Sequence, residues 1–67
     1  MSIMKELLEW LKTKQYVTEK EIEKFLRKRG ASPTTITTYI YNLQRRGILR
    51  LVEKKVIRRF EVKISSV

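Results

Sequence analysis

The segment Gly30-Ala31-Ser32-Pro33 restricts the fold of this chain more than any other part of its sequence. Glycine is favoured just after a helix, because it adopts positive φ without steric cost. Serine is a favoured N-cap residue, and proline suits the first helical position, where its missing N–H group loses no hydrogen bond. One helix therefore ends at Gly30 and the next begins at Pro33. Two helices joined by so short a turn form a helix-turn-helix unit.

Apolar residues recur at helical spacing in three segments, which predicts three helices. The first covers about residues 3–13. The second covers about 19–29, and Thr18 and Glu21 before and within it have the spacing of a capping box. The third covers 33–46 and ends before Gly47. Its expected buried side comprises Ile36, Tyr39, Ile40 and Leu43.

After Gly47 the sequence alternates between apolar and polar residues, which is the pattern of half-buried β-strands. Two antiparallel strands are expected within a hairpin over about 48–64. The residues between them include no Gly, Asn or Pro, so the type of the turn stays open. A very short third strand is possible at Tyr16 and Val17. The apolar positions of the hairpin that face the core are expected to be Leu49, Leu51, Phe60, Val62 and Ile64.

The segment Leu43-Gln44-Arg45-Arg46-Gly47-Ile48-Leu49 resembles the end of the recognition helix in the winged-helix (winged helix-turn-helix) DNA-binding superfamily. The resemblance spans roughly residues 3–64 and is to small regulators of archaea and of archaeal viruses and plasmids. It implies one α+β domain over 1–67: a three-helix winged helix-turn-helix with a C-terminal two-stranded antiparallel β-hairpin as the wing. It also implies that helix 33–46 enters the major groove. Because the wing is short and lacks glycine, contact with phosphates is expected instead of insertion into the minor groove.

The side of helix 33–46 opposite its apolar stripe carries the expected base-reading residues. A threonine methyl can touch a thymine methyl, asparagine can pair with adenine, and arginine can pair bidentately with guanine. Four threonines within 34–38 are poor helix formers, which favours a functional reason for their presence. The alternative is that Thr34 and Thr35 only extend the helix cap. The candidate base-reading residues are Thr34, Thr37, Thr38, Tyr41, Asn42 and Arg45.

The chain carries a net charge of +9, and this charge is unevenly distributed. Residues 1–44 contain eight basic residues and five glutamates, whereas residues 45–67 contain eight basic residues and only two glutamates. The basic part includes the end of the third helix and the hairpin, which favours a polyanionic partner. A solvated charged surface is the alternative. The candidate phosphate-binding residues are Ser32, Arg46, Lys54, Lys55, Arg58 and Arg59.

Several functions are not expected from this composition. Without Cys, His or Asp, the sequence offers no disulfide, no Cys/His metal site and no recognisable catalytic set, so neither an enzyme nor a cofactor is predicted. No small-molecule ligand is indicated. No apolar run approaches the length of a membrane span, so a cytoplasmic, nucleoid-associated protein is expected. The balance of Lys, Glu and Ile over Asn and Gln leans towards a thermophile.

The sequence therefore predicts sequence-specific binding of double-stranded DNA by a transcriptional regulator. The alternative is a winged-helix protein-interaction module within a larger complex, which would need neither the net charge nor the polar helix face. One recognition helix reads only a few base pairs, so a homodimer on a palindromic site is expected. The apolar residues available for such a contact are Val52, Val56, Ile57, Trp10 and Val67.

Overall fold

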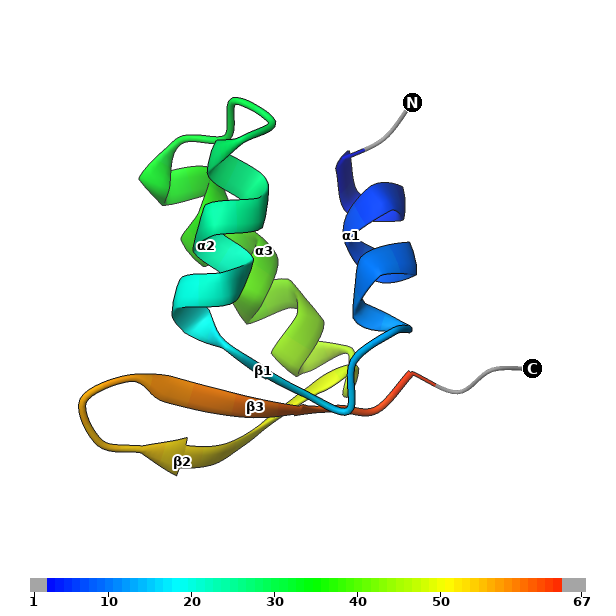
Figure 1. Cartoon of the computed structure of the whole chain (residues 1–67), viewed down its shortest axis with the longest axis vertical. Helices are drawn as coiled ribbons and strands as arrows, with labels where there is room; N and C mark the ends of the chain where they lie inside the picture. Colours follow the sequence, from blue (N-terminus) through cyan, green and yellow to red (C-terminus); the bar gives the residue numbers. More distant parts are fainter. Residues whose placement is uncertain (1–2, 65–67) are drawn as a thin grey trace.

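A computed structural model describes residues 3–64 of the chain. Three helices stand on one side of a small β-sheet (Figure 1). Each helix begins at the residue expected from the sequence and ends one or two residues earlier than expected. The elements, in chain order, are α1 Ile3–Leu11, β1 Tyr16–Thr18, α2 Glu19–Arg27, α3 Pro33–Arg45, β2 Leu49–Lys54 and β3 Arg58–Val62.

The starts of α2 and α3 are fixed by the capping residues that the sequence predicted. At α2, the Glu21 amide donates to Thr18 Oγ1 over 3.2 Å, and the Thr18 amide donates to Glu21 Oε1 over 2.9 Å. This reciprocal pair is a capping box, as expected. At α3, the Thr35 amide donates to Ser32 Oγ over 3.3 Å, and Pro33 occupies the first turn. Both caps satisfy amides that have no partner within the helix.

Both helices of the helix-turn-helix end in the same glycine motif. Gly30 has φ +84° and Gly47 has φ +78°, values in the left-handed region. The amide of the residue after each glycine donates five residues back, from Ala31 to the Leu26 carbonyl and from Ile48 to the Leu43 carbonyl. Each glycine amide donates three residues back. These paired bonds are a Schellman motif, which closes the last helical turn and explains why the regular helices end early.

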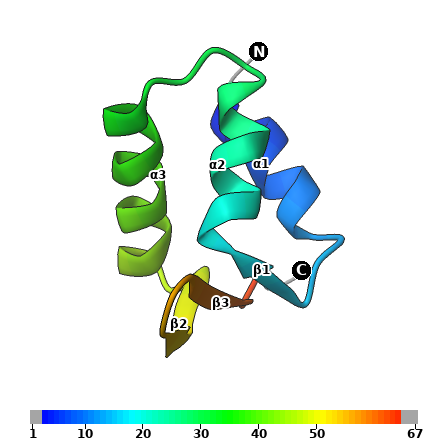
Figure 2. The ribbon, with the colours of Figure 1, turned by 60° about the vertical axis from the view of Figure 1, so that its left-hand side comes forward.

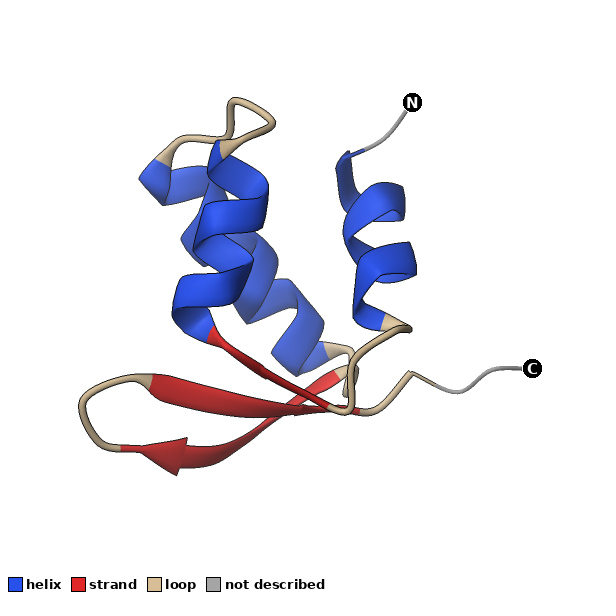
Figure 3. Ribbon diagram, viewed as in Figure 1, coloured by secondary structure: helices blue, strands red, loops and turns tan. Residues whose placement is uncertain are grey.

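The sheet contains three antiparallel strands in the order β1-β3-β2, whereas the expected fold named only a two-stranded hairpin (Figure 3). The short strand considered at Tyr16 and Val17 is real: β1 pairs with β3, placing Val17 opposite Phe60. On the other side of β3, Leu51 lies opposite Phe60, and a β-bulge follows between Leu51 and Glu53. The α+β arrangement of three helices and this sheet is compatible with a winged helix.

The core lies between the three helices and the sheet. Phe60, on the central strand, is fully buried, and Ile36, Ile40 and Leu43 of α3 are buried with it. Tyr39, expected on the same side of α3, is half-buried. Within residues 3–64, no charged or polar residue belongs to the buried set. The core therefore fixes which side of α3 faces inward, and hence which side faces solvent.

Trp10 joins α1 to α2 at the edge of this core. Its ring stacks on Phe25 with the ring centroids 4.6 Å apart, and both rings are half-buried. The Arg29 guanidinium lies 3.7 Å from the centroid of the Phe25 ring, and Arg29 also pairs with Glu6 of α1 over 3.3 Å. As the sole tryptophan of the chain, Trp10 is a natural fluorescence probe of folding.

The first prediction concerns Gly47, which turns the chain from α3 into β2. A Cβ at this position would meet no atom within 4 Å, so steric crowding would not destabilise Gly47→Ala. The cost comes from φ +78°, which L-residues other than Asn and Asp rarely adopt. We expect Gly47→Ala to lower the free energy of unfolding by about 1 to 2 kcal/mol. Gly47→Asn, the matched control, should lower it by less. Urea titration followed by Trp10 fluorescence measures both, and equal effects would contradict this explanation.

Candidate nucleic-acid interface

Helix α3 forms one side of the molecule, with α2 and then α1 beside it and β2 below its C-terminal end (Figure 2). Its inward residues Ile36, Ile40 and Leu43 hold it against the core. The opposite side is therefore presented to solvent along the whole helix. At about 1.5 Å per residue, the 13 residues of α3 extend about 20 Å. This length exceeds the width of a B-DNA major groove, about 12 Å, so both helix ends can reach the strands that border a groove.

The structure brings the predicted base-reading residues together on this exposed side. Tyr41 is 60% exposed, at the middle of the helix. Asn42 differs from the others because it is half-buried and lines a hollow with Met4 of α1, Arg45 and Arg46. Asn42 thus lies at the edge of the surface. The exposed members of the set are Thr34, Thr37, Thr38, Tyr41 and Arg45.

The threonine hydroxyls of α3 are not equivalent. Thr37 Oγ1 donates to the Pro33 carbonyl over 3.1 Å, and Thr38 Oγ1 donates to the Thr34 carbonyl over 2.9 Å. Thr35 Oγ1 lies 3.0 Å from Ser32 Oγ at the helix cap. The idea that threonines extend the cap therefore applies to Thr35. The Thr34 hydroxyl has no hydrogen-bond partner within the described part of the chain and remains open to an external group.

Positive charge gathers at the C-terminal end of α3. The guanidinium of Arg45 lies 5.9 Å from the centroid of the Tyr41 ring, one turn earlier. Arg46 is also exposed, and Arg50 follows on β2 with its side chain 69% exposed. Sequence reasoning counted Arg50 in the charge but gave it no role. Its position as the first polar residue of the alternating strand, three residues after Gly47, was the signal that could have identified it.

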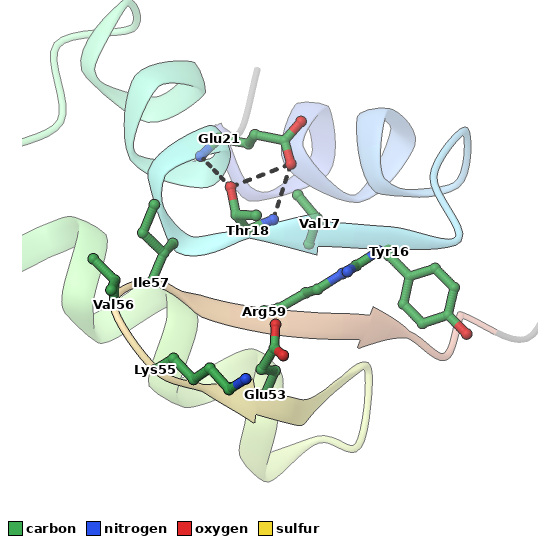
Figure 4. A pocket seen from close by; sticks show the side chains of 9 residues that line it. All are labelled: Tyr16, Val17, Thr18, Glu21, Glu53, Lys55, Val56, Ile57 and Arg59. Carbon is green, nitrogen blue, oxygen red and sulfur yellow. Dashed lines mark hydrogen bonds between the residues drawn. The ribbon is translucent and has the colours of Figure 1, made fainter.

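The hairpin divides its cations between the two faces of the sheet, because residues next to each other on a strand point to opposite faces. Arg58 pairs with Lys54 across the strands, and Arg59 pairs with Glu53. The Arg58 guanidinium bonds to Glu19 Oε2 at the start of α2 over 3.5 Å. Arg59 instead points along the other face, with its guanidinium 5.2 Å from the centroid of the Tyr16 ring (Figure 4). These two predicted phosphate ligands are thus held apart.

The remaining predicted phosphate ligands lie at the ends of this surface. Ser32 caps the start of α3, where its hydroxyl already contacts Thr35. Lys54 ends β2, which is the edge strand of the sheet on the side of α3 (Figure 2). Lys55 begins the three-residue loop before β3 and is exposed beside Val56, which is 97% exposed. Ser32 and Arg46 therefore bracket α3, with Lys54 and Lys55 extending the basic surface along the hairpin.

The fold and this surface define a class: a small α+β domain, compatible with a winged helix, that exposes a polar helix beside a basic hairpin. Comparisons with protein-family models, curated proteins and solved structures found no match to the chain. Within residues 3–64, no helix is long and apolar enough to cross a membrane. In the same part of the chain, no cluster of three or more acidic, Cys or His side chains could hold a metal ion.

Proposed function

We propose that this protein binds double-stranded DNA sequence-specifically and acts as a transcriptional regulator. Helix α3 would lie in the major groove and the hairpin against the phosphates. The observation that carries the proposal is the composition of the exposed side of α3, where threonine, tyrosine and arginine side chains lie together. None of these side chains belongs to the buried core. These groups match the donors, acceptors and methyl groups that base pairs expose in the major groove.

The charge distribution supports the same proposal. Arg45 and Arg46 adjoin the exposed side of α3, and Lys54 and Lys55 extend the positive surface along the hairpin. Arg50 lies opposite Glu61 of β3 and pairs with it over 4.0 Å. Lysine and arginine side chains beside a helix in the major groove strengthen binding, because they neutralise DNA phosphates and release the counterions bound there. A DNA-bound regulator would reside with the nucleoid, in the cytoplasm of an archaeal cell. No catalytic step and no cofactor forms part of this proposal.

Arg58 and Arg59 would have to exchange their present contacts for phosphates. Exposed ion pairs such as Arg58–Glu19 contribute only about 0 to 1 kcal/mol, so a DNA phosphate can compete with them. The side-chain ends of these two arginines lie over β1 and the start of α2. Arg59 lines one hollow with Lys55, whereas Arg58 reaches the start of α2, so the two arginines would meet the DNA on different faces of the hairpin.

The alternative function is a winged-helix protein-interaction module. The hairpin supplies the observation that favours it, since Val52, Val56 and Ile57 are all exposed apolar residues near its tip. Scattered exposed apolar residues are common on proteins, so this observation has less weight than the composition of α3. A DNA-binding protein of charge +9 needs a nucleic-acid partner, whereas an interaction module needs a protein partner. A DNA-binding measurement therefore distinguishes the two functions.

The second prediction concerns binding itself. Labelled duplex DNA should bind at low salt, and the logarithm of the affinity should fall linearly with the logarithm of salt concentration. With about five to eight phosphate contacts, the slope should be roughly −5 to −7. Fluorescence anisotropy across a KCl series measures the slope. Absence of duplex binding at low salt would reject the DNA-binding proposal and favour the interaction module.

The third prediction separates the roles of α3 and the hairpin. Arg45→Ala should weaken binding to a selected site by about 1 to 3 kcal/mol and relax the preference at one base pair. Lys55→Ala combined with Arg59→Ala should instead weaken specific and non-specific binding alike and flatten the salt slope by roughly one unit per lost contact. Anisotropy titrations on selected and random duplexes measure both effects.

The matched control for the hairpin variant is Lys12→Ala combined with Lys24→Ala. This variant removes the same charge from outside the candidate interface. Lys12 directly follows α1, and Lys24 of α2 lines a hollow with Trp10 and Phe25. Its salt slope should stay near that of the parent protein. Circular dichroism checks that every variant is folded. If the hairpin variant changed the preferred sequence while Arg45→Ala left it unchanged, the assigned roles would be reversed.

The fourth prediction is that the protein forms a homodimer on DNA. A single α3 spans few base pairs, and dimeric helix-turn-helix proteins bind half-sites one helical turn apart, about 34 to 36 Å. Trp10 is half-buried against Phe25, and Val67 lies outside the described residues, so the exposed Val52, Val56 and Ile57 remain the candidate contact. Light scattering should give twice the chain mass of 8.1 kDa. A monomer both free and on DNA would contradict the prediction.

A further inference from the structure

The exposed side of α3 carries two adjacent threonines whose hydroxyl protons are already used. Thr37 donates to the Pro33 carbonyl, and Thr38 donates to the Thr34 carbonyl. A hydroxyl has one proton to donate and two lone pairs that accept. Both side chains are exposed, so what they offer to an external partner is a methyl group and an acceptor oxygen. Neither can offer a donor unless it first breaks a bond within the helix.

This restriction excludes some partners in the major groove. Guanine presents only acceptors there, at N7 and O6, and an acceptor oxygen cannot bond to either atom. Adenine presents the N6 amino donor, and thymine presents its C5 methyl group. Cytosine presents a donor but lacks the methyl group. An adenine–thymine pair is therefore the base pair that supplies partners for both exposed groups of these threonines.

The chemistry changes along the helix towards its C-terminal end. Arg45 has donors but no acceptor, and it lies seven residues after Thr38, or about 10 Å along the helix axis. Between them, Tyr41 presents an exposed aromatic ring beside Arg45. The acceptor and methyl groups of α3 are thus separated from its guanidinium by a defined distance.

We propose that Thr37 and Thr38 select an adenine–thymine pair by contact of their γ-methyl groups with the thymine methyl. This inference rests on the proposed function, because it assigns a base preference to the same helix. It differs from general DNA affinity in that it depends on one methyl group of the DNA and on two methyl groups of the protein.

The experiment begins with a duplex selected from random sequence by the parent protein. Each thymine of the selected site is then replaced singly by deoxyuridine, which removes the C5 methyl group and leaves base pairing intact. We expect one or two replacements to weaken binding about four-fold, the effect of exposing one buried methyl group. Replacements elsewhere in the site should have no effect.

Protein variants then identify the residue that contacts this methyl group. Thr37→Ser and Thr38→Ser remove the γ-methyl and keep the hydroxyl, so at least one of them should bind the thymine and uracil duplexes equally well. Thr38→Val keeps a methyl group at the same place and should retain the discrimination. Thr35→Ser is the matched control, because the Thr35 hydroxyl bonds to Ser32 at the cap and its side chain lies off the exposed face. Its discrimination should equal that of the parent.

The outcomes distinguish this inference from the proposed function. Failure of the parent protein to bind any duplex would remove both. Salt-dependent binding with no sensitivity to any deoxyuridine would leave DNA binding intact and overturn the inference. Sensitivity that persists unchanged in both serine variants would also overturn it, because another side chain would then contact the thymine methyl. Loss of discrimination in a serine variant, with Thr38→Val and Thr35→Ser unchanged, would support the inference.

Discussion

The burial of Phe60 packs the β-sheet against the three helices. Phe60 lies on the central strand, opposite Val17 of β1 on one side and Leu51 of β2 on the other, and its ring is fully buried beneath the helices. A chain of 67 residues buries a limited core, so each large apolar side chain contributes a substantial share of the stability. Leu49 of β2 and Val17 of β1 are buried in the same core, so each strand contributes one buried side chain that holds the sheet against the helices. The relation between α3 and the hairpin therefore depends on buried side chains that belong to neither exposed surface.

The geometry of the hairpin explains why its cations do not act as one group. Side chains alternate between the faces of a strand, so Arg58 and Arg59 must point in opposite directions. The bulge after Leu51 shifts the register, which places Glu53 opposite Arg59 and Lys54 opposite Arg58. One arginine consequently reaches Glu19 and the other reaches Tyr16. The backbone pairing, more than the amino-acid composition, decides which positive charges share a surface with α3.

The features that could be predicted from sequence are local. Thr18 with Glu21, Ser32 with Pro33, and the glycines at 30 and 47 act on neighbours within a few residues, so their roles followed from spacing alone. The exposed face of α3 followed from its apolar stripe for the same reason. Pairing between distant segments could not be derived in this way. Leu51 was expected on the core but is 38% exposed, because β2 is an edge strand that ends the sheet. Which hairpin residues lie opposite one another likewise depends on the register and on the bulge after Leu51, which alternation alone does not specify.

The separation of α3 into two sides has a consequence for the evolution of this domain. Ile36, Ile40 and Leu43 are constrained by packing, whereas Thr34, Thr38 and Tyr41 contribute nothing to the core. Mutations on the exposed side are therefore nearly neutral for stability, and selection can alter them one at a time without passing through an unfolded intermediate. Under the proposed function, duplicated copies of the gene would diverge in the DNA sites that they bind while keeping the same scaffold. Because the helical period places core residues and exposed residues on opposite sides of α3, the two sets can change at different rates in evolution.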